Sequence, residues 1–242
     1  MLIIEQPIRP EWSALPPECL SEGVVLSINK PYGWTSADVV RKVKFMLQRH
    51  WKIKNIKVGH AGTLDPLATG ILLICIGRAT KAADSLQSEQ KEYIASIRLG
   101  ATTPSFDLEK EIDQIYPIEH ITEENIRESL KNLTGVQMQV PPQFSAKLVD
   151  GVRAYERARS GVQTTLNPAQ IEIFETELMQ ISLPDIVVRI RCSKGTYIRS
   201  FARDLGYALR SGAHLTGLVR SQNGAFLMAN AIDLENIEKI FH

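Results

Sequence analysis

The chain has 242 residues, of which 44% are hydrophobic and 23% charged, and this composition excludes a largely disordered protein. No apolar stretch approaches the roughly 20 residues of a membrane helix, and an N-terminus with Glu5 and several prolines is unlike a signal peptide. The formal net charge of +1 gives no sign of a polyanionic partner by its sum alone. We therefore expect a cytoplasmic protein without a membrane segment.

The first 22 residues carry scattered prolines and no clear period, so an irregular lead-in is expected there. A β-branched run predicts a strand over residues 23–29, which Pro31 ends. Thr35 or Ser36 then caps a helix with an apolar stripe of Val39, Val40, Val43, Phe45, Met46 and Leu47.

The next segment, residues 56–65, is punctuated by glycine and leaves little room for regular structure. Residues 70–77 are continuously apolar, which predicts a strand covered on both faces. A short helix is expected over residues 80–86, and an alternating pattern predicts a strand over residues 92–99.

The second half of the chain also interleaves strands and helices. Strands are predicted over 171–183 and 186–192, with Pro184-Asp185 as their turn. Helices are predicted after the cap Thr122 and over 154–160, 197–209 and 232–240. Residues 212–226 are spaced by glycine and receive no assignment. The pattern predicts an α+β fold with a mixed sheet, as one domain over residues 1–242 with a basic, turn-rich excursion near 140–168.

Charge is distributed unevenly along the chain. One segment contains seven basic residues and no acid: Arg41, Lys42, Lys44, Arg49, Lys52, Lys54 and Lys57. The acids gather in 109–113, 119–128 and 233–238. Such a chain can present a basic face while it stays near neutral overall. A solvated helix face followed by a basic loop explains the same pattern equally well, so the pattern permits an RNA partner without requiring one.

The residues from Gly59 to Gly70 (GHAGTLDPLATG) are the densest chemical feature of the chain. Pro66 biases Asp65 away from helical backbone angles, and the carboxylate then adjoins an apolar strand. A lone Asp-Pro is most often a loop aspartate bonded to its own backbone, but the surrounding glycines favour a functional carboxylate. The segment lacks the Gly-Lys-Ser/Thr of a phosphate-binding loop.

A cationic partner for such a carboxylate is available in the segment 193–200 (SKGTYIRS). Arg199 lies in the first turn of a predicted helix, and its guanidinium fork matches a carboxylate, although most arginines of this kind are surface residues. The five histidines show no metal-ligand spacing. The cysteines Cys19, Cys75 and Cys192 are far apart and odd in number, and because Cys75 and Cys192 lie in apolar, strand-like runs, buried hydrophobic roles fit these two better than a disulfide. We therefore expect neither a metal nor a cofactor. The expected chemistry is that of a carboxylate assisted by aromatic and Arg side chains.

The chain resembles the TruB family of tRNA pseudouridine-55 synthases in a series of motifs that covers about residues 24–226. The segment Gly59–Pro66 resembles the family's catalytic motif. The other matching segments follow in the family's order: 29–36 (NKPYGWTS), 91–93 (KEY) with 98–100 (RLG), 141–147 (PPQFSAK), 194–206 (KGTYIRSFARDLG), 213–220 (AHLTGLVR) and 224–226 (GAF). Residues 141–147 are similar to the region of the family's RNA-gripping thumb.

The resemblance implies the pseudouridine synthase fold, a mostly antiparallel mixed sheet flanked by helices with a thumb insertion. It also implies conversion of uridine 55 in the T-loop of tRNA to pseudouridine without a cofactor. Asp65 would act on the ribose or the base, either by attack on C1′ or by removal of the C2′ proton. Arg199 would pair with Asp65, and Tyr93 would stack on the flipped base and help to remove the C5 proton.

Four further roles are implied by the same resemblance. Tyr197 and Leu218 would line the uracil pocket, and His60 would fill the space that the flipped base leaves in the RNA. Lys30 would be structural or would contact a phosphate. The T-arm of tRNA is the expected partner, and a monomer is the expected state.

The chain departs from the family pattern at three places. Ser221 stands where Thr is usual, and the loop after Gly100 reads Thr103-Pro104 and ends at Lys110, although Asp107 is kept. Family members usually carry a C-terminal PUA domain, and 242 residues leave no room for it. We therefore expect no PUA domain and a greater dependence on the thumb and the basic segment. A synthase acting on another uridine, and an RNA chaperone without chemistry, are the alternatives; intact Asp65, Tyr93 and Arg199 favour the enzyme.

Overall fold

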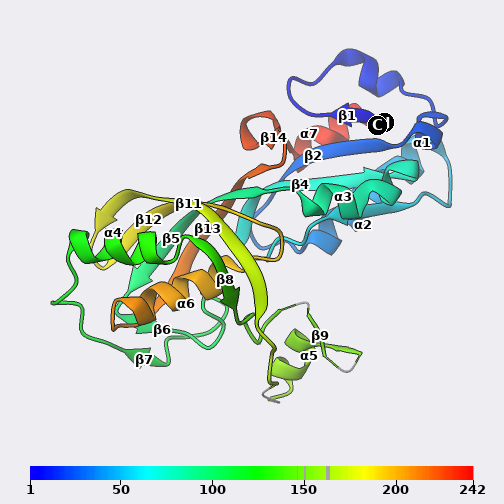
Figure 1. Cartoon of the computed structure of the whole chain (residues 1–242). Coiled ribbons are helices and arrows are strands. Elements are labelled where there is room, and N and C mark those ends of the chain that lie inside the picture. The colour runs from blue at the N-terminus through cyan, green and yellow to red at the C-terminus, as the bar shows by residue number, and fades with distance from the viewer. Residues whose placement is uncertain (146, 150, 162–163, 242) are drawn as a thin grey trace. The chain divides into compact units, whose positions relative to one another are not determined.

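The computed structural model describes residues 1–145, 147–149, 151–161 and 164–241 (Figure 1). These residues group into two units. The first unit contains Met1–Glu92 and the C-terminal segment from Val219, and the second contains Tyr93–Leu218. Both boundaries fall inside strands, β5 (Lys91–Leu99) and β13 (Ala213–Asn223), so each of these strands contributes to both units.

The first unit is built on strands in the hydrogen-bonded order β1-β2-β4-β13. β2 pairs antiparallel with β4, which also pairs with β3, whereas β1 and β15 lie parallel to β2. The new strands are β1 (Leu2–Ile4), β2 (Val24–Lys30), β3 (Val58–Ala61), β4 (Ala68–Ile76), β14 (Phe226–Leu227) and β15 (Ile232–Asp233). The helices are η1 (Pro10–Ala14), α1 (Cys19–Glu22), α2 (Ser36–Trp51), η2 (Gly77–Ala82), α3 (Ala83–Ser88), η3 (Met228–Asn230) and α7 (Leu234–Ile240).

Apolar side chains cover both faces of the β2–β4 pair. Val24, Leu26, Leu72 and Ile74 belong to a core with the inner sides of α2 and α7. Val25, Ile71, Leu73 and Cys75 belong to a second core with Phe226 and Ala231. Because alternate residues of a strand point to opposite faces, β4 is buried along nearly its whole length, and the predicted doubly covered strand is confirmed.

Helix α2 begins where the sequence indicates. Thr35 is its cap: the Thr35 hydroxyl accepts from the Asp38 N–H at 3.0 Å, and the Asp38 carboxylate accepts from the Thr35 N–H at 2.9 Å. Val39, Val43, Met46 and Leu47 are buried as predicted. The placement of Phe45 in the apolar stripe is wrong, because its side chain is 62% exposed on the opposite side of the helix.

The second unit has the strand order β13-β5-β12-β11-β8. The predicted hairpin is confirmed, since β11 (Ala169–Ser182) pairs antiparallel with β12 (Asp185–Cys192) through the turn at Leu183-Pro184. β8 (Gly135–Gln139) pairs antiparallel with β11. The helices are α4 (Glu123–Asn132), α5 (Ala154–Arg159) and α6 (Ile198–Ala208), and two small ribbons are β6 (Ala101–Thr102) with β7 (Gln114–Ile115) and β9 (Leu148–Val149) with β10 (Val152–Arg153).

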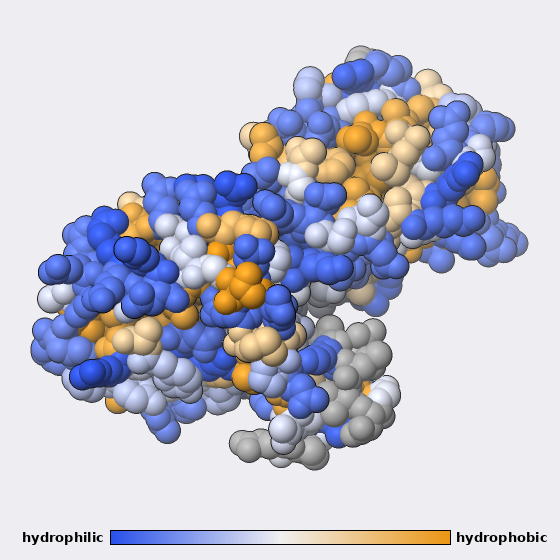
Figure 2. All heavy atoms as spheres, viewed as in Figure 1, coloured by the Kyte–Doolittle hydropathy of each residue, from blue (hydrophilic) through white to orange (hydrophobic). Residues whose placement is uncertain are grey.

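Two expectations about regular structure were wrong, and one segment without an assignment contains a strand. The lead-in contains β1, η1 and α1. Residues 56–65 contain β3, whose backbone pairs with β4 in spite of Gly59. Residues 212–226 contain β13, an eleven-residue strand whose buried polar residues and glycine hide its period. Hydrophilic residues cover most of the face shown in Figure 2, and apolar residues gather there in patches on both units. Among the described residues, no helix is long and apolar enough to span a membrane.

Gly70 provides a test of the close approach between β4 and β13. Gly70 has φ +97°, and a Cβ there would lie 2.3 Å from the Arg220 carbonyl oxygen. Gly33 has φ +80°, and a Cβ there would meet nothing within 4 Å, so it is a matched control for the backbone strain alone. We expect Gly33→Ala to lower the free energy of unfolding by about 1–2 kcal/mol and Gly70→Ala by about 3 kcal/mol or more. Chemical denaturation measures both, and equal losses would contradict the close approach.

Candidate active site

The loop that carries Asp65 lies between β3 and β4. Gly62, at φ +96°, turns the chain where the loop leaves β3, and Gly70, at φ +97°, lies near the start of β4. Between them Leu64 is buried, and its backbone makes two bonds with one side chain: the Ser36 hydroxyl accepts from the Leu64 N–H at 2.9 Å and donates to the Leu64 carbonyl at 3.1 Å. The Asp65 carbonyl accepts from the Ala68 N–H at 3.1 Å. Ser36, the first residue of α2, thus fixes the backbone of Leu64, which precedes Asp65. The Asp65 side chain itself is half-buried.

Two buried cations donate hydrogen bonds to carbonyl groups of this loop and of the segments beside it. The Lys30 ammonium, at the end of β2, donates to the carbonyls of Pro31, Trp34 and Pro66 at 2.8, 2.6 and 3.2 Å. The Arg220 guanidinium, from β13, donates to the carbonyls of Ile71, Thr63 and Gly62 at 2.7, 3.3 and 3.1 Å. Lys30 is 0% exposed and Arg220 is 1% exposed. Of the two expected roles of Lys30, these bonds favour the structural role over a phosphate contact, because all three ammonium protons are used.

The charges of the loop influence one another. Burial lowers the pKa of the Lys30 ammonium from 10.5 to about 8, while Asp65 raises this pKa and Arg220 lowers it further. Burial also lowers the pKa of His60, and the charge of Arg220 adds to that shift. His60 is therefore a neutral imidazole at neutral pH, and its Nδ1 is buried without a hydrogen-bond partner among the described residues.

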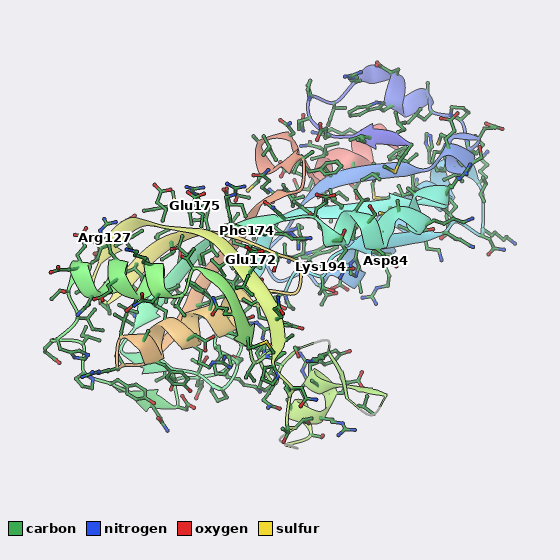
Figure 3. The ribbon with its side chains drawn as sticks, in the orientation of Figure 1. Asp84, Arg127, Glu172, Phe174, Glu175 and Lys194 are labelled. Atoms are coloured by element: carbon green, nitrogen blue, oxygen red, sulfur yellow. The ribbon has the colours of Figure 1, made fainter. Side chains whose placement is uncertain are left out.

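Arg199 occupies the first turn of α6 in the second unit. The turn before α6 is tied to β11, because the Ser193 N–H donates to the Glu172 carbonyl at 2.8 Å and the Glu172 N–H donates to the Ser193 hydroxyl at 2.9 Å; Glu172 and Lys194 are labelled in Figure 3. The Gln139 amide binds both backbone groups of Tyr197, at 2.8 and 3.2 Å. Strands β11 and β8 thus fix the start of α6.

The Arg199 side chain is 4% exposed and has several partners within its unit. Its Nη2 donates to the Phe144 carbonyl at 3.0 Å and its Nη1 to the Ser105 carbonyl at 3.5 Å. Its Nε lies 3.7 Å from an Asp107 carboxylate oxygen. The other Asp107 oxygen accepts from the Glu109 N–H at 3.0 Å. The loop at 103–109 and the base of the thumb therefore both depend on Arg199.

The predicted site residues divide between the two units. The first unit brings Lys30, His60 and Asp65 together on one loop and its supports. Four residues belong to the second unit: Tyr93 on the buried side of β5, Leu218 on β13, and Tyr197 and Arg199 at the start of α6. The pairing of Arg199 with Asp65 stays a prediction. Arg220 and Gln139 were missed, although a lone arginine in the apolar run Leu218-Val219-Arg220 is a signal for a buried cation.

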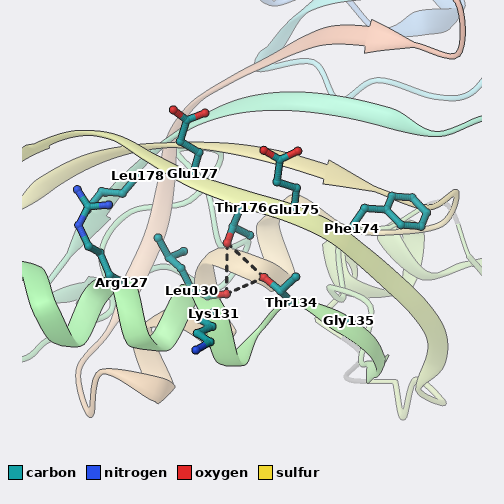
Figure 4. Close-up of a pocket in the computed structure, with 10 residues that line it drawn as sticks. All are labelled: Arg127, Leu130, Lys131, Thr134, Gly135, Phe174, Glu175, Thr176, Glu177 and Leu178. Carbon is teal, nitrogen blue, oxygen red and sulfur yellow. Dashed lines mark hydrogen bonds between the residues drawn. The ribbon is translucent and has the colours of Figure 1, made fainter.

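A hollow of about 520 Å³ elsewhere in the second unit is not part of this site. It lies between the end of α4 and β11 (Figure 4). The polar groups that line it already bond to one another, since the Thr134 and Thr176 hydroxyls both donate to the Leu130 carbonyl, at 3.0 and 3.3 Å. Glu175 and Glu177 point away from α4 and pair with Arg189. No residue of the predicted site lines the hollow.

Solved structures with a similar fold include complexes that contain Cbf5. A Cbf5-Nop10-Gar1 complex matches with a TM-score of 0.70 and 26% identity, over 96% of this chain and 59% of that one. The archaeal box H/ACA sRNP Nop10-Cbf5 complex matches with a TM-score of 0.66 and 26% identity, over 97% and 60%. The chain thus spans about three fifths of the length of the Cbf5 chains. The mixed, mostly antiparallel sheet flanked by helices is confirmed as the pseudouridine synthase fold.

Family and relatives agree with this fold. The model of the TruB family pseudouridylate synthase N-terminal domain matches residues 48–198. A tRNA pseudouridine synthase B of Bacteroides fragilis is 54% identical over 88% of this chain and 91% of its own length. Those of Flavobacterium johnsoniae and Clostridium kluyveri are 50% and 44% identical, over 98% and 72% of their own lengths. The chain is a pseudouridine synthase, an isomerase. It belongs to the TruB family.

The titration of Lys30 tests the charge balance of the Asp65 loop. The unfolded chain holds the Lys30 proton up to its ordinary pKa of 10.5, whereas the folded chain loses it near pH 8. The unfolded state binds more protons between these values, so the contribution of Lys30 makes the protein more stable as the pH rises through this window. The difference in the free energy of unfolding between wild type and Lys30→Met should therefore rise from about pH 8 to about pH 10 and be flat below about pH 7.

Urea denaturation at a series of pH values measures the free energy of unfolding of both proteins. The other titrating groups are the same in both, so their effects cancel in the difference. Lys239→Met, at an exposed lysine, is the matched control for removal of one charge. A difference that falls with pH across the window would contradict the buried cation.

Proposed function

We propose that this chain converts uridine 55 in the T-loop of tRNA to pseudouridine, with Asp65 as the catalytic carboxylate. The observation that carries the proposal is the Asp65 loop, in which Lys30, Arg220 and Ser36 hold the backbone on both sides of the carboxylate. Membership of the TruB family and the names of the relatives support the reaction and the substrate. The T-arm as the bound part of tRNA, a monomer as the active state and the cytoplasm as the location belong to the same proposal.

The two units would act as one catalytic domain in this proposal. The target base leaves its stack, at a cost of a few kcal/mol, and enters a pocket with Tyr197 and Leu218. Tyr93 stacks on the base, and the neutral His60 ring fills the vacated space in the RNA. Arg199 pairs with Asp65 in addition to its own carbonyl partners.

The chemistry is an isomerisation. The N1–C1′ bond breaks, uracil turns, and C5 bonds to C1′; the C5 proton leaves and N1 gains one, so the atoms balance without a co-reactant. Asp65 acts either as the nucleophile at C1′ or as the base that takes the C2′ proton, and both roles need an ionised carboxylate held still. The rigid loop meets this need, since proximity and orientation lower the barrier only when the reacting groups hold their geometry.

Asp65→Asn is the decisive substitution. It keeps the size and the loop bonds of residue 65 and removes the nucleophile or base, so pseudouridine formation should fall by at least about 10³-fold while the melting temperature changes little. Unmodified tRNA is incubated with each protein, and pseudouridine is mapped by a chemistry-specific reverse-transcription stop. Wild-type protein that forms no pseudouridine would refute the enzyme, and a stop at another uridine would redirect the proposal to that site.

Arg199→Lys tests whether the guanidinium itself is needed. Lys keeps the charge but cannot reach Phe144, Ser105 and a carboxylate together, so kcat/KM should fall by about 10- to 100-fold. Arg210→Lys, at an exposed position past the end of α6, is the control and should retain full activity. Activity of Arg199→Lys equal to that of the control would remove Arg199 from the proposed site.

A further inference from the structure

Helix α2 and the residues after it expose an unusual group of side chains, which we call the α2 surface. It consists of five exposed cations and one aromatic ring: Lys44, Phe45, Arg49, Lys52, Lys54 and Lys57. The neighbouring cations Arg41 and Lys42 have carboxylate partners, Asp38 and Glu238. Within the described part of the chain, no carboxylate forms a salt bridge with any of the five cations.

Five unpaired like charges within fourteen residues repel one another and produce a positive potential that attracts a polyanion. Phe45 is 62% exposed among them and packs in no core. Exposed aromatic rings beside cations are the combination that binds nucleic acid, because the cations neutralise phosphates and the ring stacks on an unpaired base. An acidic protein would use the cations and leave the ring unexplained. The side chains therefore favour RNA as the partner.

The α2 surface is physically connected to the Asp65 loop. Ser36 at the start of α2 binds both backbone groups of Leu64, and the loop before α2 binds Pro66 through the Gly33 N–H at 2.9 Å. That loop exposes two more aromatic rings, Tyr32 at 62% and Trp34 at 36%. From Ser36, Lys44 lies about 12 Å and Lys52 about 24 Å along the helix at 1.5 Å per residue.

We propose that the α2 surface binds the phosphate backbone of the tRNA body, beyond the hairpin that holds the target uridine. This inference rests on the proposed function. It gives the enzyme a second RNA contact, carried by the same helix that holds the catalytic loop. Phe45 stacks on an unpaired base of that body, and the exposed cations release counterions from its phosphates.

A triple substitution tests this surface against a matched control. The test variant is Lys44→Gln, Arg49→Gln and Lys52→Gln; the control is Lys131→Gln, Arg210→Gln and Lys239→Gln, which neutralises three exposed cations elsewhere. Each protein is assayed for binding over a range of salt concentrations and for kcat/KM, with full-length unmodified tRNA and with the isolated T-arm hairpin. Thermal melting verifies that each variant is folded.

With full-length tRNA, the test variant should bind more weakly than wild type, and the slope of log K against log salt should become shallower by about 2 to 3. With the hairpin, it should behave as wild type, and the control should match wild type with both RNAs. Equal weakening on both RNAs, or no weakening on either, overturns the inference. Wild type that binds tRNA but forms no pseudouridine refutes the proposed function instead, so the two failures are distinguishable.

Phe45 provides an independent readout that involves no charge. Phe45→Ala should weaken binding of full-length tRNA by about fivefold or more, and Phe45→Tyr should retain it, because a Tyr ring stacks as well. If Phe45→Ala binds full-length tRNA with unchanged affinity, the proposed stacking contact is refuted.

Discussion

The first unit depends on the bonds that the buried cations Lys30 and Arg220 make with carbonyl groups around Asp65. A loop rich in glycine and proline cannot pair its carbonyls within a sheet, and a buried carbonyl without a donor is costly. A neutral donor would satisfy one or two carbonyls, whereas the ammonium and the guanidinium together donate to six, three of them in this loop, through stronger charge-assisted hydrogen bonds. The sheet positions the two cations: β2 ends at Lys30, and β13 brings Arg220 beside the start of β4. Ser36, at the start of α2, completes the support.

The two cations carry an electrostatic cost, because like charges in a buried region oppose each other. Burial lowers the pKa of Lys30 most, Asp65 raises it and Arg220 lowers it, so the Asp65 carboxylate helps to stabilise the cation that supports its own loop. The chemistry and the local stability are therefore linked at Asp65. Asp65→Asn removes one charge contribution among several to the pKa of Lys30, so its loss of activity should far exceed its loss of stability.

Long periodic segments were predictable from the sequence, and short or polar ones were not. The apolar run of β4 and the capped start of α2 follow from local pattern alone. β13 was missed because its pairing partners β4 and β5 are distant in sequence and because glycine and buried polar residues interrupt its period. β3 was missed because it is short and contains Gly59. Asp65 could be singled out from the glycine density around it. The support by Arg220 could not, because it joins residues that are about 150 positions apart and only tertiary structure brings them together.

Arg199 shows how a predicted catalytic residue acquires a structural task. Its guanidinium joins the loop of Ser105 and Asp107 to Phe144, at the base of the thumb. The Gln143 amide, next in sequence, binds both backbone groups of Thr164 across that base, at 3.1 and 2.7 Å. The segment expected to grip RNA is thus held by the residue expected to face the catalytic carboxylate. Any substitution of Arg199 therefore removes the support of the Phe144 and Ser105 carbonyls as well as the proposed pairing with Asp65.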